Sequence, residues 1–448
     1  MKKSTAILLL GALGAFVIAP SSLNVAQASE AKEAKKEHKS YRASKKVPAM
    51  RNRVYAQLAR AQKLADDGDK IEGFEVLEQV HDRIDSLNSY EKAMLFNFYG
   101  FMYYGNDDIA MAIDSFKKVV ADHGVIPDSL VISTLYSLAQ LSMQEQDYPQ
   151  ALEYLSQWQK VNAKDLTANQ QILFAQVHYQ SKQYQQSLDY INQAIAMVEQ
   201  ENKLPKENWL ILQRAAYYEL KQPEQVTKVI EQLVRYYDKP EYWLQLSGMY
   251  GEIGQEDKQM AVMEAAYQAG YVTKSADVLT LAQLYLFHNA PYKSAKLLAG
   301  AIEEGTVVAD EKNLDVLARA YLAAKEDKQA IKVLTKVSGI ASSGKYDALL
   351  AQTYLNNEQW QQAITAAQNA ITRFEQNSAE DKAAANSYLG NMYLAQGMAN
   401  FNLKRFDKSL TAFAKASKQP KVQKTAQQWA KYVERERESH KVQLAMLN

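Results

Sequence analysis

Residues 96–120 read FNFYGFMYYGNDDIAMAIDSFKKVV, and the fold follows from this stretch. Gly100 and Tyr103 lie three residues apart and Ala112 and Phe116 four apart, so each pair shares one face of a helix. A Gly-Asn-Asp-Asp segment interrupts the helical pattern between the two pairs. The stretch therefore predicts a helical hairpin. Gly100 and Ala112 let the two backbones approach closely, and Tyr103 and Phe116 fill the space beside that contact.

The same pattern recurs along the chain. The small residue that opens each second helix serves as a marker, and most successive markers lie 33 to 39 residues apart. A helix-turn-helix unit with a period near 34 is typical of the tetratricopeptide repeat. The markers are Gly73, Ala112, Ala151, Ser187, Val226, Gln259 or Met260, Ala295, Ala330, Ala363 and Ser409. The last step is longer, so residues 375–389 either lengthen the first helix of the last unit or insert a loop.

The repeat units resemble the tetratricopeptide repeat family at several in-phase positions. Matching residues in four of the units are Ala139, Tyr148, Ala151, Leu155 and Trp158; Ala175, Tyr184, Ser187, Ile191 and Ala194; Leu317, Ala318, Tyr321, Ala330 and Leu334; and Ala351, Tyr354, Trp360, Ala363 and Ala370. The resemblance implies an all-α fold, a right-handed α-solenoid of about ten helical hairpins. The low content of helix breakers, 17 Gly and 9 Pro in 448 residues, agrees with such a fold.

The expected organisation is a stack of hairpins in sections, because 448 residues exceed what one compact core supports. Residues 422–440 place Trp429, Tyr432 and Val433 on one side of a helix that is otherwise charged, which predicts a capping helix. The predicted sections are an N-terminal stack (51–204), a middle stack (205–374), a last unit with an insertion (375–420), and the capping helix and tail (421–448).

The N-terminus has the order of a secretory signal peptide. Lys2 and Lys3 precede an apolar run over residues 6–19, and Ala26-Gln27-Ala28 supplies small residues for cleavage. We expect residues 1–28 to be removed after Ala28 and the protein to be periplasmic; an uncleaved inner-membrane anchor is the alternative. The chain has no cysteine, which excludes disulfides and a lipid-bearing Cys.

Charge gives little evidence for nucleic-acid binding. The chain has 52 basic and 51 acidic residues, so no nucleic-acid partner is expected. Residues 29–50 are locally basic and predict a disordered leader. The alternative is a tether to anionic lipid or cell-wall polymer, so any membrane contact is at most peripheral.

Candidate catalytic and cofactor motifs are weak. Gly339–Tyr346 fits the phosphate-loop spacing G-x-x-x-x-G-K, but Tyr346 replaces the magnesium-binding Ser or Thr and a helix precedes it, so a linker between hairpins is favoured. The six histidines, His38, His81, His123, His178, His288 and His440, are scattered without metal-ligand spacing. We therefore expect no metal, no cofactor and no enzymatic activity.

A peptide-binding groove is the remaining candidate site. The tetratricopeptide resemblance implies that the first helix of each hairpin lines the concave side, where Tyr and Gln side chains bind partners well. The residues at those positions are Phe101, Tyr104, Tyr136, Gln140, Gln176, Tyr179, Tyr218, Gln283, Phe287, Arg319 and Gln352. Tyrosines at helical spacing belong to the core more often than to a binding surface. The groove has no cluster of Lys, Arg and Asn of the kind that binds a C-terminal carboxylate.

A narrower resemblance concerns function. Residues 289–298 (NAPYKSAKLL), the Cys-free signal sequence and residues 428–433 (QWAKYV) are similar to the periplasmic repeat proteins encoded beside TonB, ExbB and ExbD energy-transduction systems. This resemblance implies a scaffold that contacts other envelope proteins, or a peptide segment of one, and is accessory to TonB-dependent uptake. The alternative is a scaffold for envelope assembly or polysaccharide export.

Overall fold

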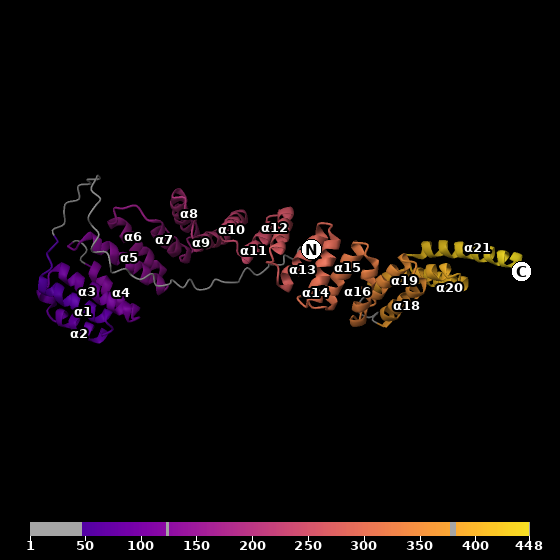
Figure 1. Ribbon diagram of the computed structural model, residues 1–448, viewed down its shortest axis with the longest axis horizontal. Coiled ribbons are helices and arrows are strands. Elements are labelled where there is room, and N and C mark those ends of the chain that lie inside the picture. The colour runs from indigo at the N-terminus through magenta and orange to yellow at the C-terminus, as the bar shows by residue number, and fades with distance from the viewer. Residues whose placement is uncertain (1–46, 122–124, 377–381, 448) are drawn as a thin grey trace. The chain divides into compact units, whose positions relative to one another are not determined.

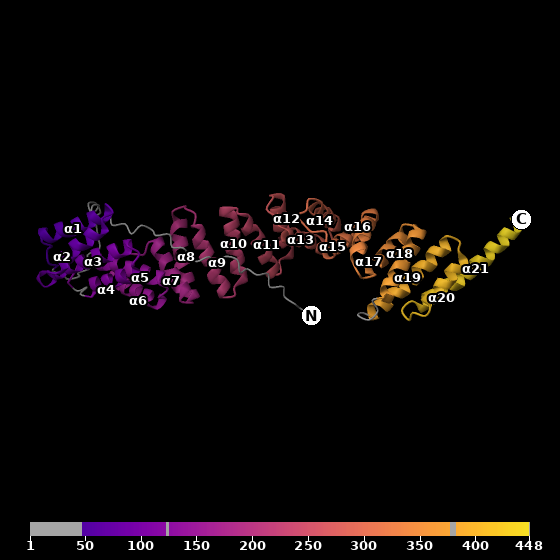
Figure 2. The same cartoon turned by 90° about the horizontal axis from the view of Figure 1, so that it is seen from below.

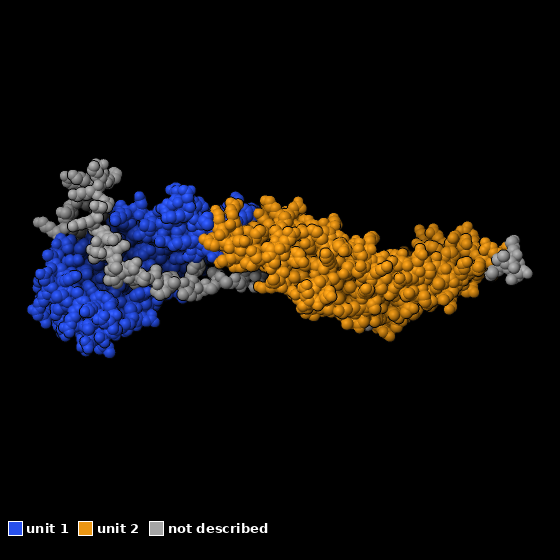
Figure 3. All heavy atoms as spheres, in the orientation of Figure 1, with its two compact units in different colours: residues 1–232 blue, residues 233–448 orange. Residues whose placement is uncertain are grey.

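The structure, a computed structural model, describes residues 47–121, 125–376 and 382–447. The predicted signal peptide and most of the basic leader lie outside the described residues. The chain divides into two compact units, residues 1–232 and 233–448 (Figure 3). The subdivision predicted at residues 204 and 374 stays a prediction.

Every regular element among the described residues is helical (Figure 1). The first unit contains α1 (Asn52–Asp66), α2 (Lys70–His81), the 3₁₀ turn η1 (Ile84–Ser86), α3 (Ser89–Gly105), α4 (Ile109–Val120), α5 (Asp128–Gln144), α6 (Tyr148–Val161), α7 (Ala168–Gln180), α8 (Tyr184–Gln200) and α9 (Glu207–Glu219). The unit boundary falls within α10 (Pro223–Tyr237). The second unit contains α11 (Pro240–Glu252), α12 (Glu256–Gln268), α13 (Ser275–Phe287), α14 (Pro291–Glu303), α15 (Glu311–Ala323), α16 (Asp327–Ile340), α17 (Lys345–Asn356), α18 (Trp360–Gln376), α19 (Lys382–Asn402), α20 (Phe406–Ala416) and α21 (Gln423–Leu447).

Within each unit the helices pack in chain order (Figure 2). The helices of a hairpin contact each other, as α3 does α4, and each hairpin contacts the next, as α4 does α5 in the first unit and α14 does α15 in the second. The predicted all-α solenoid of helical hairpins is confirmed. None of the helices in the described part of the chain combines the length and apolar character that a membrane span needs.

One turn geometry closes all ten hairpins of the described residues. The second residue after each first helix has positive φ, and the residue after it donates its N–H to the carbonyl five residues earlier at 2.7 to 3.0 Å. This is the left-handed helix termination that glycine favours. Only two of these residues are glycine, and the full set is Gly68, Asp107, Gln146, Lys182, Lys221, Gly254, Asn289, Lys325, Glu358 and Lys404.

The close approach of α3 and α4 is confirmed at Gly100. A Cβ atom at Gly100 would lie 2.5 Å from a ring carbon of Phe116, whose side chain is fully buried. Gly397 stands in the same relation to Phe413 in the last hairpin, at 2.6 Å. Tyr103 packs against the core that contains Ala112 and Phe116, and its ring centroid also lies 4.9 Å from that of Phe74 in the preceding hairpin.

Serine hydroxyls join the helices of three hairpins where small residues meet. Ser187 donates to the carbonyl of Ala175, Ser294 to that of Ala282 and Ser409 to that of Gly397, at 2.7 to 2.8 Å. Each acceptor lies 12 residues before its donor, which makes Ser294 the equivalent of Ser187 and Ser409. The marker assigned to Ala295 is therefore wrong by one residue. Ser294 and Ala295 are both small and fully buried, so the sequence alone does not distinguish them.

In the sixth hairpin the hydroxyl is on the first helix. Ser247 donates to the carbonyl of Gln259 at 2.9 Å, again across 12 residues. The marker in that hairpin is therefore Gln259 and not Met260.

The long step before the last hairpin reflects longer helices. α18 extends to Gln376 and α19 begins at Lys382, so helices on both sides of the connection are lengthened. Phe374 and Tyr388 stack across this extension with ring centroids 5.2 Å apart. Of the two alternatives, a longer first helix in the last unit agrees with the start of α19 at Lys382, and the extension of α18 adds to it.

The C-terminal helix α21 caps the second unit as predicted. Trp429 stacks on Phe413 with centroids 5.8 Å apart, and Val433 is fully buried. α21 thereby covers the apolar face of α20 that would otherwise meet water.

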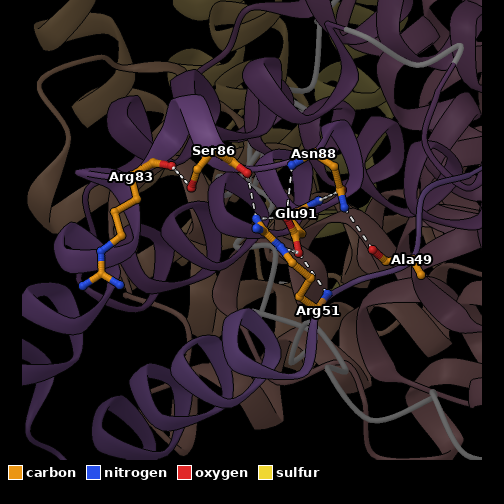
Figure 4. Close-up of polar contacts among 6 residues, drawn as sticks. All are labelled: Ala49, Arg51, Arg83, Ser86, Asn88 and Glu91. Atoms are coloured by element: carbon orange, nitrogen blue, oxygen red, sulfur yellow. Dashed lines mark hydrogen bonds and ion pairs between the residues drawn. The ribbon is translucent and has the colours of Figure 1, made fainter.

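A buried carboxylate fastens the start of α1 to the start of α3 (Figure 4). Glu91 is fully buried and accepts hydrogen bonds from Arg51 Nε at 2.8 Å, Arg51 Nη2 at 2.6 Å and the Arg51 backbone N–H at 2.9 Å. Glu91 also completes a capping box with Asn88. The hydrogen bonds from the Arg51 side chain lower the pKa of Glu91 from its usual 4.5 to about 2.

We expect Glu91→Gln to destabilise the first hairpin at neutral pH. Glutamine keeps the capping box but loses the charge-assisted bonds, a cost of about 1–2 kcal/mol given the exposed arginine. Because the folded-state pKa lies below the usual value, the wild-type contribution is complete above pH 4.5 and is lost as the pH falls toward 2. Hydrogen exchange of α1 and α2 between pH 6 and pH 3 measures this loss of stability.

Arg53→Ala is the matched control, since Arg53 is an exposed arginine two residues from Arg51. Equal protection of α1 in the Glu91→Gln and wild-type chains at pH 6 would refute this role of Glu91.

Candidate binding surfaces

The sequence-predicted groove residues form a set on the first helices, which we call the first-helix surface. Most of them follow the small residue of their first helix by one or four positions. In the first unit they are Phe101, Tyr104, Tyr136, Gln140, Gln176, Tyr179 and Tyr218, and in the second unit Gln283, Phe287, Arg319 and Gln352.

Three of the aromatic residues are partly buried against the core of the first unit. Phe101 lies edge-on to Phe116 at 5.2 Å between centroids, and Tyr136 lies 6.0 Å from Trp158. Burial raises the pKa of Tyr136. Tyr104 also packs against this core. These three side chains offer only part of their surface to a partner.

Other members are more open. Tyr218 is 57% exposed and Phe287 is 63% exposed, which is unusual for large apolar side chains. Gln283 and Gln352 are exposed, and Gln140 and Gln176 are half-buried. Arg319 pairs with Asp315 on its own helix at 2.5 Å. The exposed aromatic contribution therefore comes from Tyr218 in the first unit and Phe287 in the second.

Tyr179 occupies an intermediate position. Its ring meets that of Tyr184 edge-on at 5.4 Å. Burial, with the nearby Glu219 carboxylate, raises the pKa of Tyr179 to about 12, so its hydroxyl remains a neutral hydrogen-bond donor at physiological pH.

The phosphate-loop resemblance corresponds to a link between hairpins. Gly339 and Ile340 belong to the end of α16, and α17 begins at Lys345. The Lys345 ammonium donates to Asp315 Oδ1 at 2.8 Å, and a helix, α16, directly precedes the segment. The predicted linker is confirmed.

Metal-binding groups are not gathered anywhere in the described residues, which contain no cluster of three or more His, Cys, Asp and Glu side chains suited to a metal ion. His178 contacts Gln183 and stacks on Tyr190, and His440 lies against Phe406. His38 and His123 lie outside the described residues.

A second surface, which we call the fourth-hairpin groove, was not anticipated from the sequence. It is a hollow of about 960 Å³ in the first unit, lined by the end of α6, the following loop, one side of α7 and the length of α8. Its lining is rich in carboxamides and includes Gln159, Asn162, Gln171, Gln186, Gln193 and Gln200. Gln176 and Tyr179 do not line it. The groove is thus separate from the first-helix surface.

Two buried polar atoms beside this groove lack a hydrogen-bond partner. The Trp158 side chain is 1% exposed and its Nε1–H is unpartnered, and Gln171 is 7% exposed with an unpartnered Oε1. Gln171 Nε2 donates to Gln193 Oε1 at 3.0 Å. An unsatisfied buried polar group costs about 1–3 kcal/mol, so both atoms favour an additional partner.

No protein-family model and no curated protein matches the sequence. Solved structures do resemble it, at low identity. A C-terminal part of a tetratricopeptide-repeat-containing protein from Cytophaga hutchinsonii shares 14% identity and covers 57% of this chain and 98% of its own, with a TM-score of 0.37. A tetratricopeptide repeat protein from Parabacteroides merdae ATCC 43184 shares 12%, covers 59% and 98%, and has a TM-score of 0.33. MamA from Desulfovibrio magneticus RS-1 shares 14%, covers 39% and 96%, and has a TM-score of 0.31.

The period, the paired small residues and the left-handed turn of each hairpin occur together in this chain. These are the features typical of tetratricopeptide repeats. In these hairpins the residue four positions before the small residue of the first helix is usually apolar, as at Leu135, Leu210 and Leu314. A polar residue in that place, Gln171, is the signal from which the fourth-hairpin groove could have been found.

Proposed function

We propose that this chain is a non-enzymatic scaffold that binds segments of other envelope proteins through its first-helix surface. The observation that carries the proposal is the exposure of Tyr218 and Phe287 on first helices of tetratricopeptide repeats. Aromatic residues of this kind supply large contact area at low entropic cost. The exposed glutamines on the same helices can bond the peptide backbone of a partner.

The location and pathway are further parts of this proposal. The sequence supports export to the periplasm, with cleavage after Ala28, and its resemblance to repeat proteins encoded beside TonB systems supports an accessory role in TonB-dependent uptake. In this role the protein would arrange components of the uptake machinery through protein contacts.

Site-specific crosslinking tests the binding surface. A photoreactive amino acid at position 218 or 287 should give a discrete crosslinked product in intact cells. The same group at position 71 should give no such product. Ile71 is 79% exposed but lies on a second helix, outside the first-helix surface. A Tyr218→Ser and Phe287→Ser double variant should lose at least about tenfold in partner recovery, as expected for interface hot spots. Equal recovery with this variant would refute the first-helix surface.

Growth of a deletion strain under iron limitation tests the pathway separately. Reduced growth that the wild-type gene restores is expected. Normal growth there would refute the TonB role while leaving the binding surface to be judged by crosslinking.

A further inference from the structure

The ninth hairpin pairs a buried carboxylate with an arginine. Asp347 on α17 is 3% exposed and accepts a hydrogen bond from Ser338 Oγ at 2.8 Å. The Arg373 guanidinium on α18 forms an ion pair with Asp347 Oδ2 at 3.2 Å, and this oxygen has no hydrogen-bond partner. Arg373 also donates to the carbonyls of Ser338 and Ala341 at the end of α16, at 2.7 and 3.1 Å. An arginine side chain therefore bridges this carboxylate and the end of the preceding second helix.

The fourth hairpin has the same frame. Gln171 and Asp347 both lie four residues before the small residue of their first helix, and Met197 and Arg373 both lie 22 residues after it. The position of Met197 thus corresponds to that of Arg373. A buried polar residue is present in both hairpins, but the fourth lacks the arginine.

The helix before the fourth hairpin, α6, and the helix before the ninth, α16, end in the same way. The residue after α6 is Asn162 and the residue after α16 is Ala341. Both have extended backbone, and each donates its N–H to the carbonyl four residues earlier. Counted from these helix ends, Asn162 is equivalent to Ala341, and Gln159 is equivalent to Ser338. In the fourth hairpin these residues line an open hollow.

The chemistry of this hollow suits a cation with several N–H donors. Gln171 Oε1 is an acceptor without a partner, and the end of α6 carries the partial negative charge of a helix C-terminus. The charged residues of the lining are Asp165, Asp189 and Lys164, a net charge of −1. A planar guanidinium can meet several acceptors at once, which an ammonium does less well.

The remaining unpartnered atom favours a peptide as the source of the guanidinium. Trp158 Nε1–H is a donor, which a guanidinium cannot satisfy but a peptide carbonyl can. Gln193 is exposed and accepts a hydrogen bond from Gln171, so its side chain would have to turn aside for a ligand to reach Gln171.

We propose that the fourth-hairpin groove binds an arginine side chain of a partner peptide, in the way that Arg373 fills the equivalent place in the ninth hairpin. The inference deepens the proposed function, because it adds a second contact of defined chemistry that is separate from the first-helix surface.

Short peptides test the proposal on the full chain. The probes are N-acetyl-Gly-Ser-Arg-Ser-Gly-amide and its lysine and citrulline counterparts, and the readout is the indole N–H resonance of Trp158, assigned with Trp158→Phe. The arginine peptide should shift this resonance saturably, and the citrulline peptide, uncharged but similar in shape, should bind about tenfold more weakly or less. Equal binding of the three peptides, or no saturable shift with any of them, would overturn the proposal.

Filling the groove from within gives a second test. Met197→Arg should place a guanidinium where Arg373 lies in the ninth hairpin, abolish binding of the arginine peptide and preserve or raise the melting temperature. Gln171→Leu should also abolish binding; leucine is the residue that three other hairpins have at this position. The control Ile71→Ser should not affect binding. Unchanged binding in folded Met197→Arg and Gln171→Leu chains would refute the site. Crosslinking from position 218 is independent of these variants, so the two proposals can fail separately.

Discussion

Gly100→Ala is expected to lower the free energy of unfolding of the first unit by about 1–3 kcal/mol, and Gly100→Leu by at least the upper end of that range. The reason is the 2.5 Å separation between an added Cβ and the Phe116 ring. That ring is fully buried and held edge-on by Phe101, so it has little room to move. The gain in helix propensity from replacing glycine, about 1 kcal/mol at most, does not offset this clash.

Gly105→Ala is the matched control within α3, because no atom lies within 4 Å of a Cβ placed there. Denaturant unfolding followed by circular dichroism, with hydrogen exchange to locate the change, measures both variants. We expect lost protection in α3 and α4 first, since each hairpin contacts only its neighbours. Equal stability of Gly100→Ala and Gly105→Ala would contradict the close approach.

Arg373→Met should destabilise the second unit by about 3–5 kcal/mol, because it leaves the Asp347 carboxylate buried without its cation. It also removes hydrogen bonds to the carbonyls of Ser338 and Ala341 that fasten α16 to α18. Unfolding in urea and hydrogen exchange of α16 to α18 should both report the loss.

The double variant Asp347→Leu with Arg373→Met should recover most of that stability. Leucine is the residue of three other hairpins in the place of Asp347, and an apolar pair can replace a buried ion pair at little cost. If the double variant were as unstable as Arg373→Met alone, the loss would come from packing of the arginine stem and not from the stranded carboxylate.

The hairpins could be predicted from sequence because their signals are local. Gly100, Ala112 and Phe116 lie within 17 residues, and the spacing of small and large residues at helical intervals is enough to place both helices. The capping helix and the linker around Gly344 were predicted for the same reason. The adjacent pair Ser294 and Ala295 marks the limit of such reasoning, because two small residues in succession do not reveal which one meets the partner helix.

The turn residues show a second limit. Lys182, Lys325 and Glu358 adopt the left-handed conformation that sequence reasoning reserves for glycine. Their conformation is imposed by the packing of the two helices they join, which outweighs a cost of about 1–2 kcal/mol per residue.

The sequence by itself determined the all-α repeat, the number of hairpins and the cap, since these follow from periodicity along one or two helices. Only the tertiary structure decided that Tyr136 packs beside Trp158 while Tyr218 is open, because residues of the same type on equivalent helix faces differ in what the neighbouring hairpin places over them. The tertiary structure also decided that Gln171 lies beside an open groove while Asp347 is paired with Arg373. Those surroundings are made by three consecutive helices, as when Arg373 reaches Ser338 across 35 residues, and how such helices pack against one another is not written in the pattern of any one of them.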